Sequence, residues 1–113
     1  MTEQRRLSAV EILSASDAVI VDVDVPEWGT VVSLRTLSAA EAMDFNDKIK
    51  KNDKEAPARL VILSAVDAEG QPLFSEKDLG ALQRKSLKAI LRLQKEAMKL
   101  NGLSEDADAV KNG

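Results

Sequence analysis

The chain has 113 residues, of which 44% are hydrophobic and 31% charged, and its net charge is −3. This length and composition fit one folded domain of ordinary size, and the acidic balance argues against a nucleic-acid partner, because phosphate binding needs clustered Lys and Arg. With no His and no Cys, Ser-His-Asp triads, thiol catalysis and Cys-bound zinc are excluded. We therefore expect no enzyme activity, no cofactor and no metal site.

The apolar runs of the sequence are all short. None approaches the roughly 20 residues that span a bilayer, and polar residues interrupt the stretch behind the basic N-terminus where a signal peptide would need its apolar core. We therefore predict a soluble protein with no membrane partner and no visible export signal.

The first predicted element is a short helix over about residues 9–14. Ser8 and Glu11 have the spacing of a capping box, with Leu7 as a hydrophobic staple. The alternative is a frayed N-terminal arm.

The clearest local pattern lies between residues 18 and 37. Valines alternate with aspartates in the segment VDVDV, a period of two in β-branched residues that indicates a strand. The segment PEWG is typical of a turn, and TVVSLRTL forms the second strand. Pairing Val25 with Thr30 and Val23 with Val32 puts apolar side chains on one face, which supports an antiparallel hairpin.

The rest of the chain is predicted to be mostly helical. Ser38 and Glu41 form a second capping box. The apolar run 59–66 fits a buried strand or a buried helix, and Pro57 favours the helix. Ser75 caps the following helix, which breaks near Lys85 and Ser86. The predicted helices span about 39–51, 58–66, 76–84 and 87–101.

The last helix carries an apolar stripe that should face the core. The stripe contains Leu87, Ile90, Leu91, Gln94, Ala97 and Met98. Leu93 and Leu100 lie off this stripe, so they either complete the core or contact another copy of the chain. Asn101, Gly102 and Leu103 form a helix stop, in which Gly102 takes a left-handed conformation.

Two acidic groups invite a functional interpretation that their spacing does not support. Counted from Asp67, the sixth residue of a calcium loop would be Pro72, where an EF-hand needs Gly, so 67–70 is interpreted as a turn. Asp22 and Asp24 share a strand face, but a cross-strand ion pair with Arg35 is a simpler explanation than acid–base chemistry.

The fold class that follows is α+β, a mostly helical single domain with one N-terminal antiparallel β-hairpin. The domain covers residues 1–103, and residues 104–113 form a flexible acidic tail. Candidate protein-binding residues are Trp28, Leu93 and Leu100. Trp28 lies at the tip of the hairpin, where it either folds back on the hairpin or anchors a partner.

Several segments occur in a characteristic order: VDVPEWGTVV at 23–32, the apolar block at 59–66, VDAEGQPLFSEKD at 66–78 and LNGL at 100–103. In this order they resemble the tail assembly chaperones of phages with long, non-contractile tails (siphoviruses), in which a "vPEWG" hairpin, a "DxxGxPLFxxxD" turn and a terminal "LNGL" recur. The resemblance covers about residues 18–103.

The resemblance implies a non-enzymatic protein made in the cytoplasm of the infected bacterium. Such chaperones bind the tape-measure protein, keep it soluble while the major tail protein polymerises around it, and then leave, so we expect absence from the mature virion. They also self-associate along the tape measure. Many are made in a longer, frameshifted form whose extension recruits the major tail protein.

Two other functions stay open at this point. One is a structural head–tail or neck connector that remains in the phage virion. The other is a small enzyme or ligand-binding domain, which the absence of His and Cys disfavours.

Overall fold

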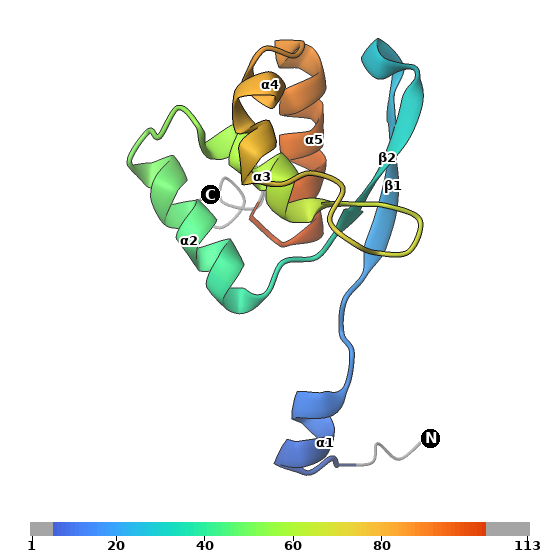
Figure 1. Cartoon of the computed structure of the whole chain (residues 1–113). Helices are drawn as coiled ribbons and strands as arrows, with labels where there is room; N and C mark the ends of the chain where they lie inside the picture. The colour runs from blue at the N-terminus through green and yellow to red at the C-terminus, as the bar shows by residue number, and fades with distance from the viewer. Residues whose placement is uncertain (1–5, 104–113) are drawn as a thin grey trace, which may run out of the picture.

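The computed structural model describes residues 6–103, so the predicted tail at 104–113 lies outside the described residues. In chain order the elements are α1 (Ala9–Ser14), β1 (Ile20–Val25), the 3-10 turn η1 (Pro26–Trp28), β2 (Thr30–Arg35), α2 (Ala39–Lys50), α3 (Ala56–Ser64), β3 (Ala65–Val66), the 3-10 turn η2 (Glu76–Asp78), α4 (Leu79–Gln83) and α5 (Leu87–Leu100). The helices α2 to α5 gather on one side of the hairpin, and α1 stands apart from them (Figure 1). The predicted α+β class is confirmed.

The hairpin has the predicted register. Val25 pairs with Thr30 and Val23 with Val32 in an antiparallel ladder. Gly29 adopts φ +64° after the η1 turn, a conformation that costs little without a Cβ. Val25 is fully buried, so the valine face of the hairpin covers the core as its two-residue period predicts.

A third strand extends this sheet, and the sequence did not predict it. The strand order is β1-β2-β3, and Ala65 and Val66 pair with Leu34 and Ser33 of β2. The run that was predicted as a helix over 58–66 is helical only to Ser64. Because this run is apolar throughout, it carries no periodicity that marks where the helix ends, and pairing with β2 decides it.

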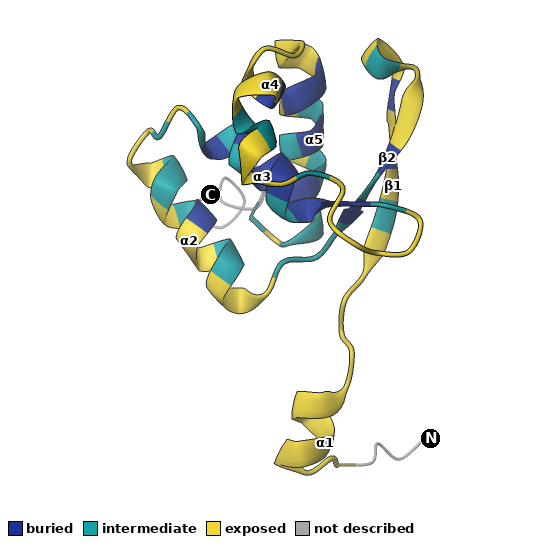
Figure 2. Cartoon of the chain, viewed as in Figure 1, coloured by how far each residue is buried: buried dark blue, intermediate teal, exposed yellow. Residues whose placement is uncertain are grey.

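Helices α3 and α5 pack against each other and form the centre of the molecule. Their buried side chains and the inner face of the sheet make one core, to which α2 adds Phe45 and α4 adds Leu82. Buried residues, dark blue in Figure 2, follow the contact between these two helices and the sheet. Aliphatic side chains and alanines fill this core, as the scarcity of aromatic residues in the sequence requires.

The buried face of α5 differs from the predicted stripe. Leu93, expected off the stripe, is 0% exposed, whereas Leu91 is 45% and Leu87 70% exposed. The side chains of α5 that face the core include Ala89 and Ala97, whose small size lets α3 approach closely. The predicted stripe included Ala97 but left out Ala89 and Leu93, and it wrongly placed Leu87 and Leu91 on the buried face because it gave most weight to large apolar residues.

The end of α5 is held by more than the predicted helix stop. Gly102 has φ +71°, and the Leu103 N–H donates to the Met98 carbonyl at 2.7 Å, as expected of a left-handed cap. In addition, the Asn101 Oδ1 accepts from the Leu37 N–H at 2.8 Å. The Asn101 Nδ2 donates to the Ala97 carbonyl, also at 2.8 Å. The LNGL segment therefore fixes the start of the α2 region to the end of α5.

Ion pairs link neighbouring elements, and one predicted pair does not form. Arg35 binds Glu41 of α2 through two hydrogen bonds of 3.1 Å, rather than an aspartate across the hairpin. Asp22 instead accepts from the Ser33 hydroxyl at 2.7 Å. The expected cross-strand ion pair was wrong. Glu41, a capping residue of α2, lies within reach of the guanidinium, and its two carboxylate oxygens accept from both terminal nitrogens of Arg35.

Helix α1 forms with its predicted capping box. The Glu11 N–H donates to the Ser8 Oγ at 3.2 Å, and the Ser8 N–H donates to the Glu11 carboxylate at 2.9 Å. None of the residues of α1 is buried, and the helix is exposed throughout in Figure 2. The predicted helix is therefore confirmed, and its side chains are exposed.

Candidate protein-binding surface

An apolar hollow lies where the tip of the hairpin meets the loop after β3. We call it the Trp28 hollow. Its lining residues come from two segments that are far apart in the sequence, one around the PEWG turn and one around Pro72: Trp28, Thr30, Val31, Val32, Ser33, Val66, Asp67, Ala68, Leu73 and Phe74. The two segments are the hairpin motif and the 66–78 motif of the sequence analysis.

The predicted turn at 67–70 shapes one wall of the hollow. The Gly70 N–H donates to the Asp67 carbonyl at 2.9 Å, and the Asp67 N–H donates to the Gln71 carbonyl at 2.8 Å. One carboxylate oxygen of Asp67 also accepts from the Glu69 and Gln71 N–H groups, both at 2.9 Å. Asp67 therefore works as a backbone cap, and the chain reverses so that Leu73 returns beside β3.

Trp28 packs inward and also borders the hollow, and its role as an anchor for a partner stays a prediction. Its side chain is half-buried and packs against the core, and it also lines the hollow. Among the described residues, its indole N–H is buried without a hydrogen-bond partner, which is costly for a buried donor. The ring therefore forms a fixed apolar wall with one unpaired donor beside an open surface.

Glu27 and Arg92 hold the tip of the hairpin against α5. Two hydrogen bonds join the guanidinium and the carboxylate, one of them 3.0 Å long. The hydrogen bond from Arg92 lowers the pKa of Glu27 below 4.5, its ordinary value. In the same way, the hydrogen bond from Arg35 lowers the pKa of Glu41.

These pKa shifts predict a loss of stability in acid. A carboxylate with a lowered folded-state pKa stabilises the folded chain fully above its ordinary value of 4.5 and loses this contribution as pH falls through the folded-state pKa. We expect the urea midpoint to decrease between about pH 6 and about pH 3, and to decrease less in Glu27→Gln. Glu69→Gln is the control, since Glu69 is exposed in a turn and in no ion pair of the described residues. Equal acid sensitivity of Glu27→Gln and the wild type would contradict this assignment.

The other two predicted contact residues do not line the hollow. Leu93 is fully buried, so it completes the core and is not available as a surface contact. Leu100 is partly buried and packs against the core at the end of α5. Sequence analysis missed Val31, Leu73 and Phe74, although each lies inside a motif segment, because only the fold brings these segments together.

Within residues 6–103, no helix is long and apolar enough to cross a bilayer, and no group of three His, Cys, Asp or Glu side chains is arranged to hold a metal ion. On the described surface, the Trp28 hollow brings exposed and half-buried apolar side chains together. These features define a small α+β domain with a candidate contact surface.

A comparison with solved structures identifies a protein with a similar fold. The tail assembly chaperone of bacteriophage HK97 matches with a TM-score of 0.61 and 26% sequence identity, over 80% of this chain and 90% of that one. No protein-family model and no curated protein matches the chain. The structural match confirms the resemblance to phage tail assembly chaperones.

Proposed function

We propose that this chain is a tail assembly chaperone that binds a phage tape-measure protein, keeps it soluble and promotes polymerisation of the tail tube around it. The role is non-enzymatic. The observation that carries the proposal is the similarity in fold and sequence to the HK97 tail assembly chaperone, together with the meeting of two motif segments in one apolar hollow.

The hollow suits a helical client. Val31 is 54% and Leu73 45% exposed, and both flank the fixed ring of Trp28. Such a surface takes one or two apolar side chains from a passing helix, as in other helix-in-groove contacts. A long client then needs many copies, each bound weakly, and coverage comes from their number.

The same proposal includes the other partners and the location. The major tail protein binds a longer, frameshifted form of the chain, and copies of the chain associate along the client. The protein acts in the cytoplasm of the host bacterium and leaves before the virion matures. Mass spectrometry of purified virions distinguishes this chaperone from a connector protein, which would remain in the particle.

Co-expression with the tape-measure protein of the same phage tests client binding. We expect the wild-type chain to keep the tape measure in the soluble fraction, in a complex with several copies per client. The double variant Val31→Asp/Leu73→Asp should lose this activity, because two carboxylates in the hollow must be desolvated when an apolar client side chain enters. Both side chains are exposed, so the variant should keep the circular dichroism spectrum of the wild type.

Met43→Asp is the matched control, since Met43 is 73% exposed on α2 and does not line the hollow. It should solubilise the client like the wild type. A tape measure that stays insoluble with the wild-type chain would refute the proposed function. Full activity of the double variant would leave the function in place and refute the hollow as its site.

A further inference from the structure

The η1 turn at the tip of the hairpin carries two side chains with different surroundings. Glu27 binds Arg92 of α5 through two hydrogen bonds, whereas the next residue, Trp28, lines the hollow. A 3-10 turn has about three residues per turn, so adjacent side chains leave it roughly 120° apart. One short turn therefore carries both the carboxylate that reaches α5 and the ring that forms a wall of the hollow, and a tilt of the turn moves both.

The tip of the hairpin has one polar link to the helices among the described residues. The third strand pairs with β2 at positions 33 and 34 only, so the end of the ladder at Val25 and Thr30 is two-stranded. A two-stranded hairpin on its own is marginal in water. Within residues 6–103, Glu27 and Arg92 form the only hydrogen bonds between η1 and a helix. The orientation of the turn therefore depends on this pair and on apolar packing.

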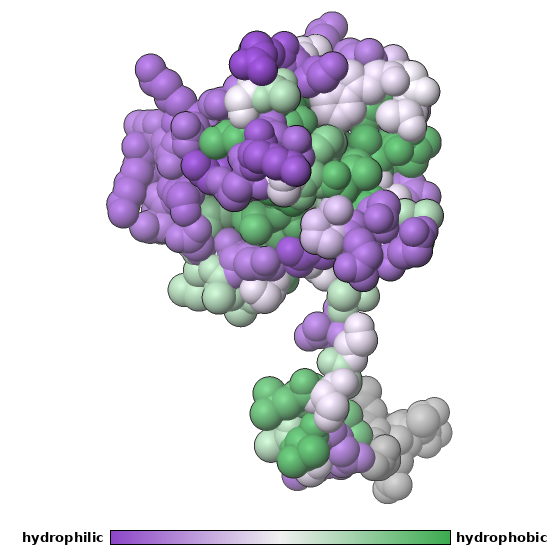
Figure 3. Space-filling view, in the orientation of Figure 1, coloured by the Kyte–Doolittle hydropathy of each residue, from purple (hydrophilic) through white to green (hydrophobic). Residues whose placement is uncertain are grey.

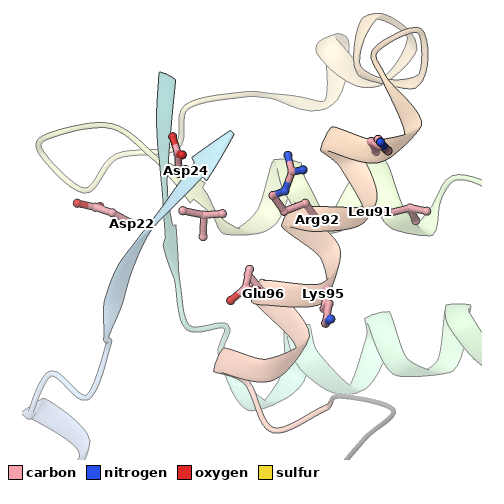
Figure 4. A pocket seen from close by; sticks show the side chains of 8 residues that line it. Asp22, Asp24, Leu91, Arg92, Lys95 and Glu96 are labelled. Atoms are coloured by element: carbon pink, nitrogen blue, oxygen red, sulfur yellow. The ribbon is translucent and has the colours of Figure 1, made fainter. Parts of the chain in front are cut away.

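The charges around this link favour the pair. Asp24 of β1 and Lys88 of α5 line a groove together with Arg92, and in Figure 4 the Arg92 side chain extends from α5 on the side where the hairpin lies. The hydrogen bond to Glu27, and to a lesser extent the charge of Asp24, raise the pKa of Arg92. The hydrogen bond from Arg92, with a smaller effect of Lys88, lowers the pKa of Glu27. Each partner therefore has a further opposite charge near it, which opposes separation of the pair.

The shape of the hollow depends on where this turn holds Trp28. The ring is half-buried and its N–H has no hydrogen-bond partner among the described residues, so no polar bond of its own fixes its orientation. The other wall of the hollow, with Leu73 and Phe74, belongs to the loop after β3. In Figure 3 apolar surface gathers where the hairpin and this loop lie side by side. A small movement of η1 would therefore change the width of the hollow.

We propose that Glu27 and Arg92 are positioning residues for the client site: their ion pair holds η1 on α5 and so fixes the ring of Trp28 at the separation from the loop that a client side chain requires. Neither residue lines the hollow, so both act through Trp28 and not by touching the client. The inference rests on the proposed function for the identity of the client. Its first measurement needs only the purified chain.

The test compares this pair with a second ion pair of the same kind. Glu41 and Arg35 are also joined by two hydrogen bonds, are exposed to a similar extent and do not line the hollow. The test variants of the full-length chain are Glu27→Gln and Arg92→Gln, and their controls are Glu41→Gln and Arg35→Gln. Glutamine removes the charge and keeps a polar side chain, and circular dichroism checks that each variant is folded.

Hydrogen exchange of the indole N–H reports the position of Trp28 without a client. The chain has one tryptophan, so its nitrogen–proton NMR correlation spectrum contains one indole signal. In the wild type this N–H is buried, and we expect its exchange with solvent to be slow there and in both controls. Exchange should be faster in Glu27→Gln and Arg92→Gln, because a loosened tip opens locally and exposes the ring to water.

Calorimetric titration with peptides of the tape-measure protein from the same phage measures the client site itself. Both test variants should bind about five- to tenfold more weakly than the wild type, since a ring that is no longer held must be immobilised on binding. Glu27→Gln/Arg92→Gln should bind no more weakly than Arg92→Gln alone, because the two residues act as one unit. Both controls should bind like the wild type.

The outcomes separate this inference from the proposed function. Unchanged indole exchange in the test variants would overturn the inference, and so would faster exchange without a loss of peptide affinity. An equal loss in the controls would also overturn it, because any broken ion pair would then have the same effect. If the wild type binds no peptide while exchange rises in the test variants alone, the pair positions the ring and the proposed function fails.

Discussion

Leu93→Asp is expected to unfold the domain, whereas Leu91→Asp, two positions away on the same helix, leaves it folded. Leu93 is 0% exposed. Removing a buried leucine side chain alone costs about 2–5 kcal/mol, and an unpaired buried carboxylate adds several kcal/mol more. The sum approaches or exceeds the roughly 5–15 kcal/mol of a typical domain.

Leu91 is the matched control for this prediction because it shares the helix and the residue type. At 45% exposure, an aspartate there keeps its water, so we expect a change in unfolding free energy within about 1 kcal/mol. Thermal melts followed by circular dichroism measure both variants. If the two variants melted at the same temperature, the buried face of α5 would be wrongly assigned.

Asn101→Ala is expected to cost about 1–3 kcal/mol of unfolding free energy. The substitution leaves the half-buried N–H of Leu37 without its acceptor, and it removes the donor to the Ala97 carbonyl. Urea titration is the measurement. The slope of the transition should be unchanged, because the surface exposed on unfolding stays the same.

Asn101→Asp separates the two hydrogen bonds of this side chain. It keeps an acceptor for the Leu37 N–H but loses the donor to Ala97, so its loss of stability should be smaller than that of Asn101→Ala. Because a carboxylate is unfavourable at the C-terminal end of a helix, the comparison is made at a pH below the aspartate pKa as well; equal loss of stability for alanine and aspartate there would contradict a contribution from the bond to Leu37.

The sequence predicts those parts of the fold that depend on residues close together in the chain. The hairpin follows from alternation around VDVDV, and α1 and α2 follow from capping boxes whose partners are three residues apart. In each case the interaction that decides the structure lies within a few residues. No long-range contact was needed to place these elements or the register of the hairpin.

The errors arise where the three-dimensional arrangement of the chain decides between partners. Ala65 pairs with β2, which is distant in the sequence. Arg35 binds Glu41, only six residues away, because the start of α2 brings that carboxylate to the guanidinium. The rotation of α5 depends on the small side chains that face α3, which carry little weight in a hydrophobic pattern. The Trp28 hollow could not be predicted for a similar reason, since its two walls are about forty residues apart in the chain.

The position of Trp28 lets intrinsic tryptophan fluorescence report on the hollow. The chain has one tryptophan and no tyrosine, so nearly all of its intrinsic fluorescence originates beside the hollow. A client side chain that enters the hollow changes the polarity around the indole and shifts its emission maximum. Binding of a client peptide that itself lacks tryptophan can thus be followed without a label.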